Sequence, residues 1–327
     1  MKSWLARVAE LTLEHRAERA DRLMALGRNR VRRRREEGYS ETYAQDDARW
    51  HRVRARAQLE RPERAEDCGS EVLSISCAGC GQVHERRAGC RLTLLCVPCR
   101  RVIAAEKRSS FVRARGVVVQ DAERRGLLRP HRRGGRWSEK LLTLTAWHDL
   151  PLVAQRIGRI LAAWPLFLRR LTDFWRAHDV KSAAWLRVFE WTPGKDGYGH
   201  PHLHVWIFAP FLERDLLEQW WREALLECSA TAPVTKVIVD IREVDATGAE
   251  YELIKYLTKD ITADGTKLAP ELFAEVYRAL DGHRSTQGSR GFMGLAEKEG
   301  SRCDCGCALP KRVRRVRQEQ PQNEREQ

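Results

Sequence analysis

Long apolar runs are missing from this sequence of 327 residues, because none approaches the roughly 18 residues that a membrane-spanning helix needs. The first residues also lack the apolar core of a secretory signal peptide and lead instead into an amphipathic pattern. No internal repeat is visible. These absences predict a cytoplasmic protein with no membrane partner.

Acidic side chains are scarce in one stretch of the chain. Lys and Arg number 59 against 45 Asp and Glu, a net charge of +14, and residues 86–136 alone carry +12, with 15 basic and three acidic residues. Clustered arginine gains free energy by releasing counterions from nucleic acid, so this stretch predicts a DNA-binding surface. The expected phosphate contacts are Arg100, Arg101, Lys107, Arg108, Arg132 and Arg133. Trp137 or Trp206 is a candidate for stacking on an unpaired base.

The length predicts about two domains plus tails, at roughly 100 to 200 residues per domain. We expect a helical, basic, Arg-rich N-terminal region (1–66), a zinc ribbon with a basic DNA-binding helix (67–136), a domain of strands and helices (137–295) and a Cys-rich, basic tail (296–327). Within 137–295, period-two patterns near residues 141–145, 186–190, 202–208 and 234–243 alternate with helical patterns over 152–178, 213–228 and 249–260. This order predicts an α+β fold with helices packed on a sheet.

Ten cysteines in a reducing compartment point to metal rather than to disulfides. Cys77-x2-Cys80 and Cys96-x2-Cys99 are separated by 15 residues, a spacing that predicts four thiolates around a tetrahedral zinc ion. The nearby residues Cys68, His84 and Cys90 compete with them as ligands.

A second cysteine cluster, Cys303-x-Cys305-x-Cys307, lies in the tail. It would need a fourth ligand from elsewhere, such as Cys228 or His283, to complete one tetrahedral site.

Three histidines occupy alternate positions of a predicted strand, at His200, His202 and His204. Alternate side chains of a strand share a face, and packing alone explains three such histidines poorly. Imidazoles held in this way bind a divalent cation. Glu190 would complete the site if its strand forms a hairpin with the histidine strand, whereas the alternative is an ordinary surface glutamate at a strand end.

A third pattern lies in the predicted helix 249–260, where Glu252, Tyr256 and Lys259 share one face. A tyrosine, a base and a cation can form a phosphotyrosine: Tyr256 attacks phosphorus, Lys259 stabilises the oxyanions, and Glu252 activates a later nucleophile. An exposed helix with a Glu/Lys pair would look similar. Tyr251 lies roughly 140° away around the helix, which favours a single-tyrosine mechanism.

Five blocks of the sequence occur in the order found in rolling-circle replication initiators of small bacterial plasmids, members of the HUH endonuclease superfamily. The blocks are Cys90-x5-Cys96-Val97-Pro98-Cys99-Arg100-Arg101, Leu142-Thr143-Leu144-Thr145, Arg187-Val188-Phe189-Glu190, His200-Pro201-His202-Leu203-His204-Val205 and Glu252-x3-Tyr256-x2-Lys259. The chain resembles this family over residues 90–292, about two thirds of its length. The Cys77/Cys80 pair and the Arg-rich head lie outside the shared core.

The resemblance implies a ferredoxin-like HUH catalytic sheet in 137–295, with Mg²⁺ or Mn²⁺ on the histidine pair. Tyr256 would nick one strand at the origin, keep the 5′ phosphate and leave a 3′ hydroxyl, and the strand would be rejoined at termination. In one branch of the family, the glutamate that Glu252 matches activates water to release the enzyme. The implied partners are single-stranded and double-stranded origin DNA with a host helicase and polymerase.

Three other interpretations stay open. The histidine spacing also fits histidine-triad nucleotide hydrolases, whose central histidine attacks phosphorus without metal, although the basic segment, the zinc ribbon and the tyrosine helix argue against them. A HUH transposase of an insertion element would share the whole catalytic pattern. A non-catalytic zinc-ribbon DNA-binding regulator would retain the sheet without the chemistry.

Overall fold

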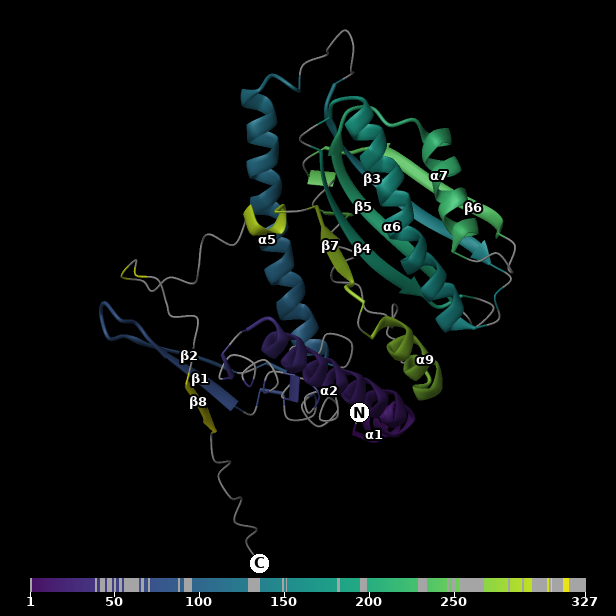
Figure 1. Cartoon of the computed structure of the whole chain (residues 1–327). Coiled ribbons are helices and arrows are strands. Elements are labelled where there is room, and N and C mark those ends of the chain that lie inside the picture. The colour runs from purple at the N-terminus through teal and green to yellow at the C-terminus, as the bar shows by residue number, and fades with distance from the viewer. Residues whose placement is uncertain are drawn as a thin grey trace, which may run out of the picture. The chain divides into compact units, whose positions relative to one another are not determined.

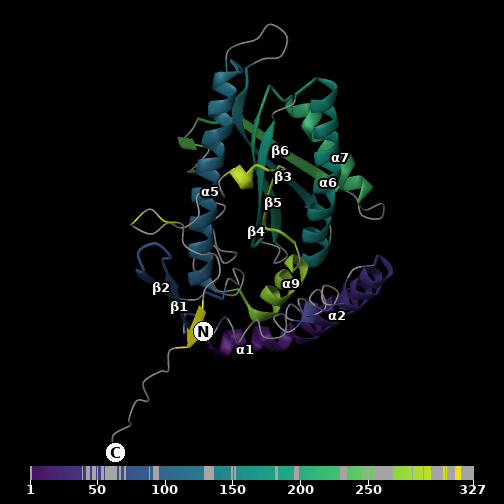
Figure 2. The same cartoon turned by 60° about the vertical axis from the view of Figure 1, so that its left-hand side comes forward.

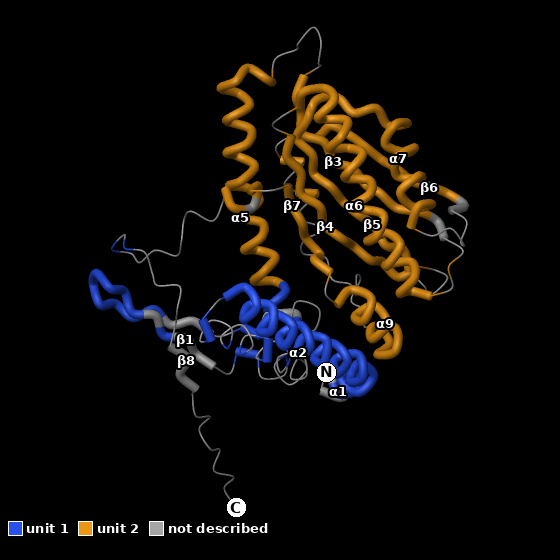
Figure 3. Tube along the Cα trace, in the orientation of Figure 1, with its two compact units in different colours: residues 1–100, 299–327 blue, residues 101–298 orange. Residues whose placement is uncertain are grey.

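Figure 1 and Figure 2 show the computed structural model of the chain from two directions. The structure describes residues 2–38, 40–41, 45, 49, 51–52, 55, 65, 68–69, 71–87, 89–90, 96–128, 136–148, 150, 152–180, 183–194, 199–228, 234–245, 247–248, 251–252, 268–281, 283–289, 291–295, 305, 307 and 314–317. The chain divides into two compact units, 1–100 with 299–327 and 101–298 (Figure 3). The expected boundaries after residues 66 and 136 do not coincide with this division, and the N-terminal region and the tail belong to the same unit.

Two helices open the first unit, α1 (Lys2–Leu11) and α2 (Leu13–Glu36), in the region where the sequence predicts helices. Buried Arg16 spans their junction, because its Nη2 donates to Ala9 O over 2.8 Å and its Nε donates to Thr12 Oγ1 over 3.3 Å. The basic end of α2 is exposed, and Arg33 Nε donates to Glu37 Oε1 over 2.7 Å. Exposed pairs of this kind add little stability.

A three-stranded sheet with strand order β2-β1-β8 completes the first unit. It consists of β1 (Glu71–Ser76), β2 (Val83–Arg87) and β8 (Arg314–Arg317), and both pairings are antiparallel. β8 comes from the C-terminal tail and lies beside β1 (Figure 1). No strand was expected in this Arg-rich tail, because a strand of four residues is too short to show a pattern in the sequence.

The second unit contains a five-stranded antiparallel sheet of order β6-β3-β5-β4-β7. Its strands are β3 (Ser138–His148), β4 (Ala184–Thr192), β5 (His200–Ala209), β6 (Val234–Glu243) and β7 (Thr286–Gly288). Its helices are α5 (Val97–Arg124), which begins in the first unit, α6 (Val153–Ala177), α7 (Arg214–Glu227), α9 (Pro270–Leu280) and the 3-10 helix η2 (Met293–Leu295). The predicted α+β fold is therefore confirmed.

The large sheet has two different faces because the side chains alternate along each strand. On one face, Trp164 of α6 packs edge-on against Trp185 of β4, with ring centroids 5.2 Å apart. On the other, Phe111 of α5 packs edge-on against Trp206 of β5 at 5.3 Å. Figure 2 shows α6 and α7 on one side of the sheet and α5 on the other. We call the side that carries Trp206 the α5 face.

An ion pair anchors α5 to this face. Arg115 of α5 donates through Nε and Nη2 to the two carboxylate oxygens of Glu139 on β3. The indole Nε1 of Trp206 donates to the same carboxylate over 2.9 Å. Both ion-pair side chains are about nine-tenths buried, at 11% and 10% exposure. Such a bidentate, mostly buried ion pair fixes the helix in one position on the sheet.

Candidate functional site

The three histidines lie on β5, which forms an antiparallel hairpin with β4. In its register, His202 lies opposite Glu190, and His204 lies opposite Val188. Thr143 of β3 lies opposite His204 on the other side. Residues that lie opposite one another in an antiparallel pair share a face. The hairpin therefore brings Glu190 beside the histidines, as the sequence-based interpretation requires, and places them all on the α5 face.

The start of β5 is held by a glycine and a buried arginine. Gly199 has a φ of +74°, and a Cβ at this position would lie 2.3 Å from the indole of Trp191. Arg156 of α6 donates through Nη1 to Gly199 O over 3.1 Å and through Nε to Leu150 O over 2.8 Å. These contacts fix the backbone immediately before His200, the first residue of the histidine strand.

His204 is held at both ring nitrogens. Its Nε2 lies 2.7 Å from Glu190 Oε2, and its Nδ1 lies 3.2 Å from Thr143 Oγ1. His204 and Glu190 are buried, at 4% and 8% exposure. Because a carboxylate only accepts, Nε2 donates to Glu190, and the Thr143 hydroxyl lies within hydrogen-bonding distance of Nδ1. The sequence alone assigned no role to Thr143, although its alternation with Leu142 and Leu144 marks it as a polar residue of that strand.

His202 and His204 lie side by side, with ring centroids 6.0 Å apart and ring planes at 18°. Among the described residues, the sets of three or more His, Cys, Asp and Glu side chains whose ligand atoms converge within 4.8 Å are two, and both consist of cysteine. Because Nε2 of His204 already engages Glu190, an ion bound there would have to replace this hydrogen bond. The catalytic metal on His200, His202, His204 and Glu190 stays a prediction.

The predicted nucleophile Tyr256 and its neighbour Lys259 lie outside the described residues. Glu252, one turn before Tyr256 in the predicted helix, is described: its Oε1 lies 3.3 Å from Nη2 of Arg242 on β6. Arg242 lies opposite Leu141 in the β3–β6 register, and Leu141 packs in the apolar cluster beneath α5. Glu252 therefore approaches the sheet from the α5 face, the same face that carries the histidines.

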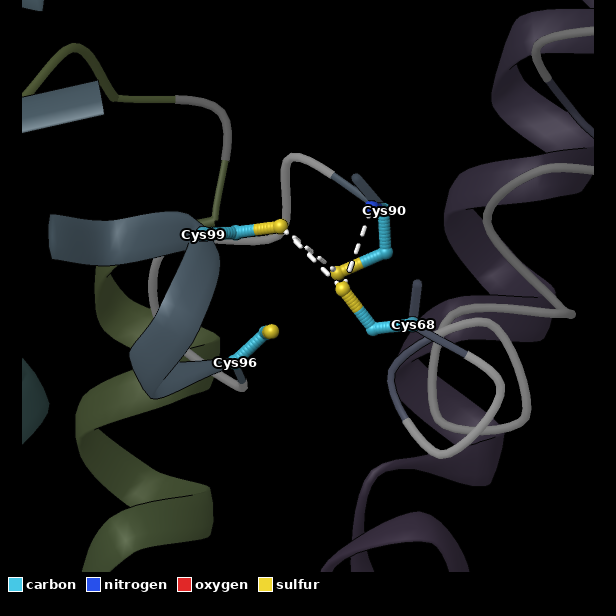
Figure 4. Close-up of side chains that lie close together, drawn as sticks. All are labelled: Cys68, Cys90, Cys96 and Cys99. Atoms are coloured by element: carbon cyan, nitrogen blue, oxygen red, sulfur yellow. Dashed lines mark hydrogen bonds between the residues drawn. The ribbon is translucent and has the colours of Figure 1, made fainter. Parts of the chain in front are cut away.

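Four cysteines, Cys68, Cys90, Cys96 and Cys99, form a compact group in the first unit (Figure 4). The Sγ atoms of Cys68 and Cys90 lie 3.3 Å and 3.6 Å from Sγ of Cys99. Thiolates bonded to one zinc ion at about 2.3 Å in a tetrahedron lie about 3.8 Å apart. A Cβ at Gly89 would lie 2.9 Å from Cys99 Sγ, so the chain leaves room there only for glycine. The group fits a zinc ion.

Zinc binding requires these buried thiols to lose their protons. Burial raises the pKa of the Cys96 thiol to about 11. Several buried thiolates need a compensating cation, which a zinc ion supplies.

The predicted ligand set of this zinc site requires a correction. The set expected from the sequence was Cys77, Cys80, Cys96 and Cys99 with Cys90, whereas in the structure Cys96 and Cys99 group with Cys90 and Cys68 and not with Cys77 and Cys80. The spacing of the cysteines alone cannot distinguish these two ligand sets. It does not show that Cys77 lies in the turn after β1, whereas Cys96 lies at the start of α5.

The second group consists of Cys77, Cys305 and Cys307, with Sγ of Cys77 3.6 Å from Sγ of Cys305. Backbone N–H groups of Cys80 and Gly79 lower the pKa of the Cys77 thiol to about 6. Neither Cys228 nor His283, the fourth ligands considered from the sequence, belongs to this group, and Cys303 lies outside the described residues.

The predicted DNA contacts Arg100, Arg101, Lys107 and Arg108 lie on α5, and Arg132 and Arg133 lie outside the described residues. Arg101 and Arg108 are exposed, whereas Lys107 turns toward the sheet. Base stacking by Trp206 is ruled out, because this indole is fully buried beneath α5. Trp137 is buried as well, at 9% exposure.

Comparisons of the chain with models of protein families, with curated protein sequences and with solved structures found no match. Among the helices that the structure describes, none is long and apolar enough to cross a membrane.

Proposed function

We propose that the protein is a HUH-type nickase that starts rolling-circle replication by cutting one DNA strand at an origin with Tyr256. The observation that carries this proposal is the arrangement of His202, His204 and Glu190 on neighbouring central strands, on the face that Glu252 approaches. A buried imidazole that bonds a carboxylate and lies beside a second imidazole suits the binding of a divalent cation.

The order of elements supports the proposal. β3, α6, β4, β5, α7 and β6 follow one another as strand, helix, strand, strand, helix, strand. Their strands are arranged as β6-β3-β5-β4, so the first strand lies between the third and the fourth. This is the ferredoxin-like arrangement that the resemblance to HUH enzymes implies. Its two middle strands, β3 and β5, carry Thr143 and the histidines.

The proposed reaction exchanges one phosphodiester for another. The phenolic oxygen of Tyr256 bonds to phosphorus, and the bond between phosphorus and the 3′ oxygen breaks. The proton lost by the phenol balances the proton gained by the 3′ oxygen, which leaves a 3′ hydroxyl and a 5′ phosphotyrosine. A bound Mg²⁺ or Mn²⁺ would act as a Lewis acid on the phosphate oxygens. Lys259 would stabilise the same oxygens, and Glu252 would activate the nucleophile that later releases the enzyme.

The basic helix α5 supports a nucleic-acid substrate. Arg101 and Arg108 are exposed on it, and the ion pair of Arg115 with Glu139 fixes the helix on the sheet face that carries the histidines. Phosphate contacts of this kind position a strand without reading its sequence.

A covalent adduct assay tests the proposal. We expect the protein, incubated with Mn²⁺ and single-stranded origin DNA, to form an adduct that survives boiling in detergent. Tyr256→Phe should abolish the adduct. Tyr251→Phe is the matched control, because Tyr251 is a 69% exposed tyrosine in the same segment, and it should leave the yield unchanged.

The other interpretations predict different results. Adduct formation that persists in Tyr256→Phe would refute the nucleophile. Hydrolysis of mononucleotides without metal, and without any adduct, would favour a histidine-triad hydrolase. DNA binding with neither activity would favour a regulator, and cleavage at transposon ends rather than at an origin would favour a transposase.

A further inference from the structure

The C-terminal tail returns to the hairpin formed by β1 and β2 through two independent contacts. β8 pairs with β1, with Leu73 opposite Arg315. Cys305 lies against Cys77 in the turn after β1, although 228 residues separate the two in sequence. The entire second unit, residues 101–298, is therefore inserted between two parts of the first.

We propose that Cys77, Cys80, Cys305 and Cys307 hold a second zinc ion, which fastens the tail to the β1–β2 hairpin. The separation of 3.6 Å between Sγ of Cys77 and Sγ of Cys305 is close to the value of about 3.8 Å expected around tetrahedral zinc. The thiols of Cys77, Cys305 and Cys307 converge within 4.8 Å of one another, and Cys80, which follows Cys77 in the same turn, would complete the set. Cys77-x2-Cys80 thus supplies two ligands from the hairpin, and Cys305-x-Cys307 supplies two from the tail.

The turn that follows β1 leaves space for the Cys307 thiol at Gly79. A Cβ at Gly79 would lie 2.4 Å from Sγ of Cys307, so any side chain at this position would occupy the place of that thiol. Gly81 N donates to Cys77 O over 2.9 Å, and Cys77 N donates to Gln82 O over 2.8 Å, which closes the turn tightly. The second zinc ion would close a chain loop that contains the whole second unit, residues 101–298.

Metal analysis of the full-length protein tests this second site. We expect two zinc ions per chain by elemental analysis and by native mass spectrometry. The double variant Cys305→Ser/Cys307→Ser should hold one, and Cys96→Ser/Cys99→Ser should also hold one. Cys228→Ser is the matched control, because Cys228 belongs to neither group, and it should keep two.

One zinc ion in the wild-type protein, or two in the tail variant, would overturn the proposal. Cys80→Ser should lose one ion and Cys303→Ser should keep both, and the reverse would replace Cys80 by Cys303 as the fourth ligand. If the variants fold poorly, cobalt substitution of the wild-type protein supplies a second measurement. Thiolate-to-metal absorption should then saturate at two cobalt ions per chain, and saturation at one would count against the second site.

A separate observation concerns a cavity of about 300 Å³ lined by Lys107 of α5 and by residues of β7 and the adjoining chain. Its described lining residues include Arg284, Thr286, Ser289 and Gly291, and none of them is acidic. Lys107 Nζ donates to Thr286 Oγ1 over 2.9 Å. Burial lowers the pKa of Lys107, so an anion bound beside it would offset the cost of its charge.

This cavity opens on the sheet face that carries the histidines. Val188 lies opposite His204 on one side and opposite Thr286 on the other. Neighbouring strands lie about 4.8 Å apart, so Thr286 lies about 10 Å from His204 across the sheet. The geometry points to a subsite for a phosphate of single-stranded DNA next to the scissile phosphate, held by Lys107 and Arg284. This inference rests on the proposed nickase function for its substrate.

Salt-dependent binding of a labelled oligothymidylate, measured with EDTA present to prevent cleavage, tests the subsite. The logarithm of affinity falls with the logarithm of salt by about 0.7 per phosphate contact on single strands. We expect Lys107→Gln to weaken binding and to reduce this slope by about 0.7, and the exposed Arg284→Gln to do the same. Arg176→Gln, on α6 over the opposite face, is the charge-matched control and should leave the slope unchanged.

An unchanged slope in both cavity variants would overturn the subsite, even if Tyr256 forms its adduct as proposed. Conversely, a reduced slope without any adduct would support the subsite and count against the nickase. The two proposals therefore fail in distinguishable ways.

Discussion

Replacing Gly199 by alanine should destabilise the second unit, residues 101–298, by about 2–5 kcal/mol. The φ of +74° at this position lies in the left-handed region, which costs a residue with a Cβ roughly 1–2 kcal/mol. The new Cβ would also lie 2.3 Å from the Trp191 indole. Trp191 is only 2% exposed, so the surrounding side chains prevent its ring from moving away. Forcing extra volume into a packed site costs typically about 1–3 kcal/mol more.

Gly126 offers a matched control within the same unit. Its φ is +70°, close to that of Gly199, but a Cβ at Gly126 would meet nothing within 4 Å. Gly126→Ala should therefore show only the backbone cost of about 1–2 kcal/mol. The difference between the two variants isolates the contact with Trp191.

Urea unfolding followed by tryptophan fluorescence measures both variants. Because Gly199 directly precedes His200, Gly199→Ala should also lower the DNA adduct yield at temperatures where the protein remains folded, whereas Gly126→Ala should not. Equal destabilisation by the two substitutions would refute the steric argument. Unchanged adduct yield in a destabilised Gly199→Ala would refute the link between this turn and the histidine strand.

Three further predictions concern buried polar groups around the sheet. Burial lowers the pKa of Lys140 to about 8 from its ordinary value of 10.5, so between these pH values the unfolded chain holds a proton that the folded protein has lost. The free energy of unfolding should therefore rise with pH from about 8 to about 10.5, and Lys140→Met should reduce this rise in urea titrations. Glu139→Gln should cost about 3 kcal/mol because it leaves the shielded Arg115 without its anion, whereas Asp173→Asn, in an exposed pair, should cost less than about 1 kcal/mol in the same measurement. Thr143→Val should weaken Mn²⁺ binding by about 10-fold or more, measured by electron paramagnetic resonance, and an unchanged affinity would remove Thr143 from the site.

The fold was predictable where side chains alternate over long segments. Period-two and helical patterns located β3, β4, β5 and β6 and the helices α6 and α7, because each of these elements buries one face. β7 and β8, of three and four residues, are too short to show a pattern. The hairpin that joins Glu190 to the histidines was predictable from the Gly-rich turn between their strands.

The cysteine groups show what spacing alone cannot determine. Cys77 and Cys96 begin similar Cys-x2-Cys motifs, so their spacing does not assign them to different metal ions. Their separation follows from β1 and β2, which hold Cys77 at a hairpin turn, while Cys96 lies at the start of α5. The partner of the hairpin turn, Cys305, lies 228 residues away in the tail, a distance over which no local motif operates.

The contacts of His204 link the core of the sheet to the proposed chemistry. Nε2 donates to Glu190, and Nδ1 lies beside the Thr143 hydroxyl. An ion bound at Nε2 would need the lone pair on that nitrogen, so the ring proton would have to move to Nδ1 and be accepted by the Thr143 hydroxyl. Threonine suits this exchange because its hydroxyl both donates and accepts, whereas a valine of the same shape does neither. The hydrogen bond between His204 and Glu190 therefore holds together two of the side chains that the proposed metal would use as ligands.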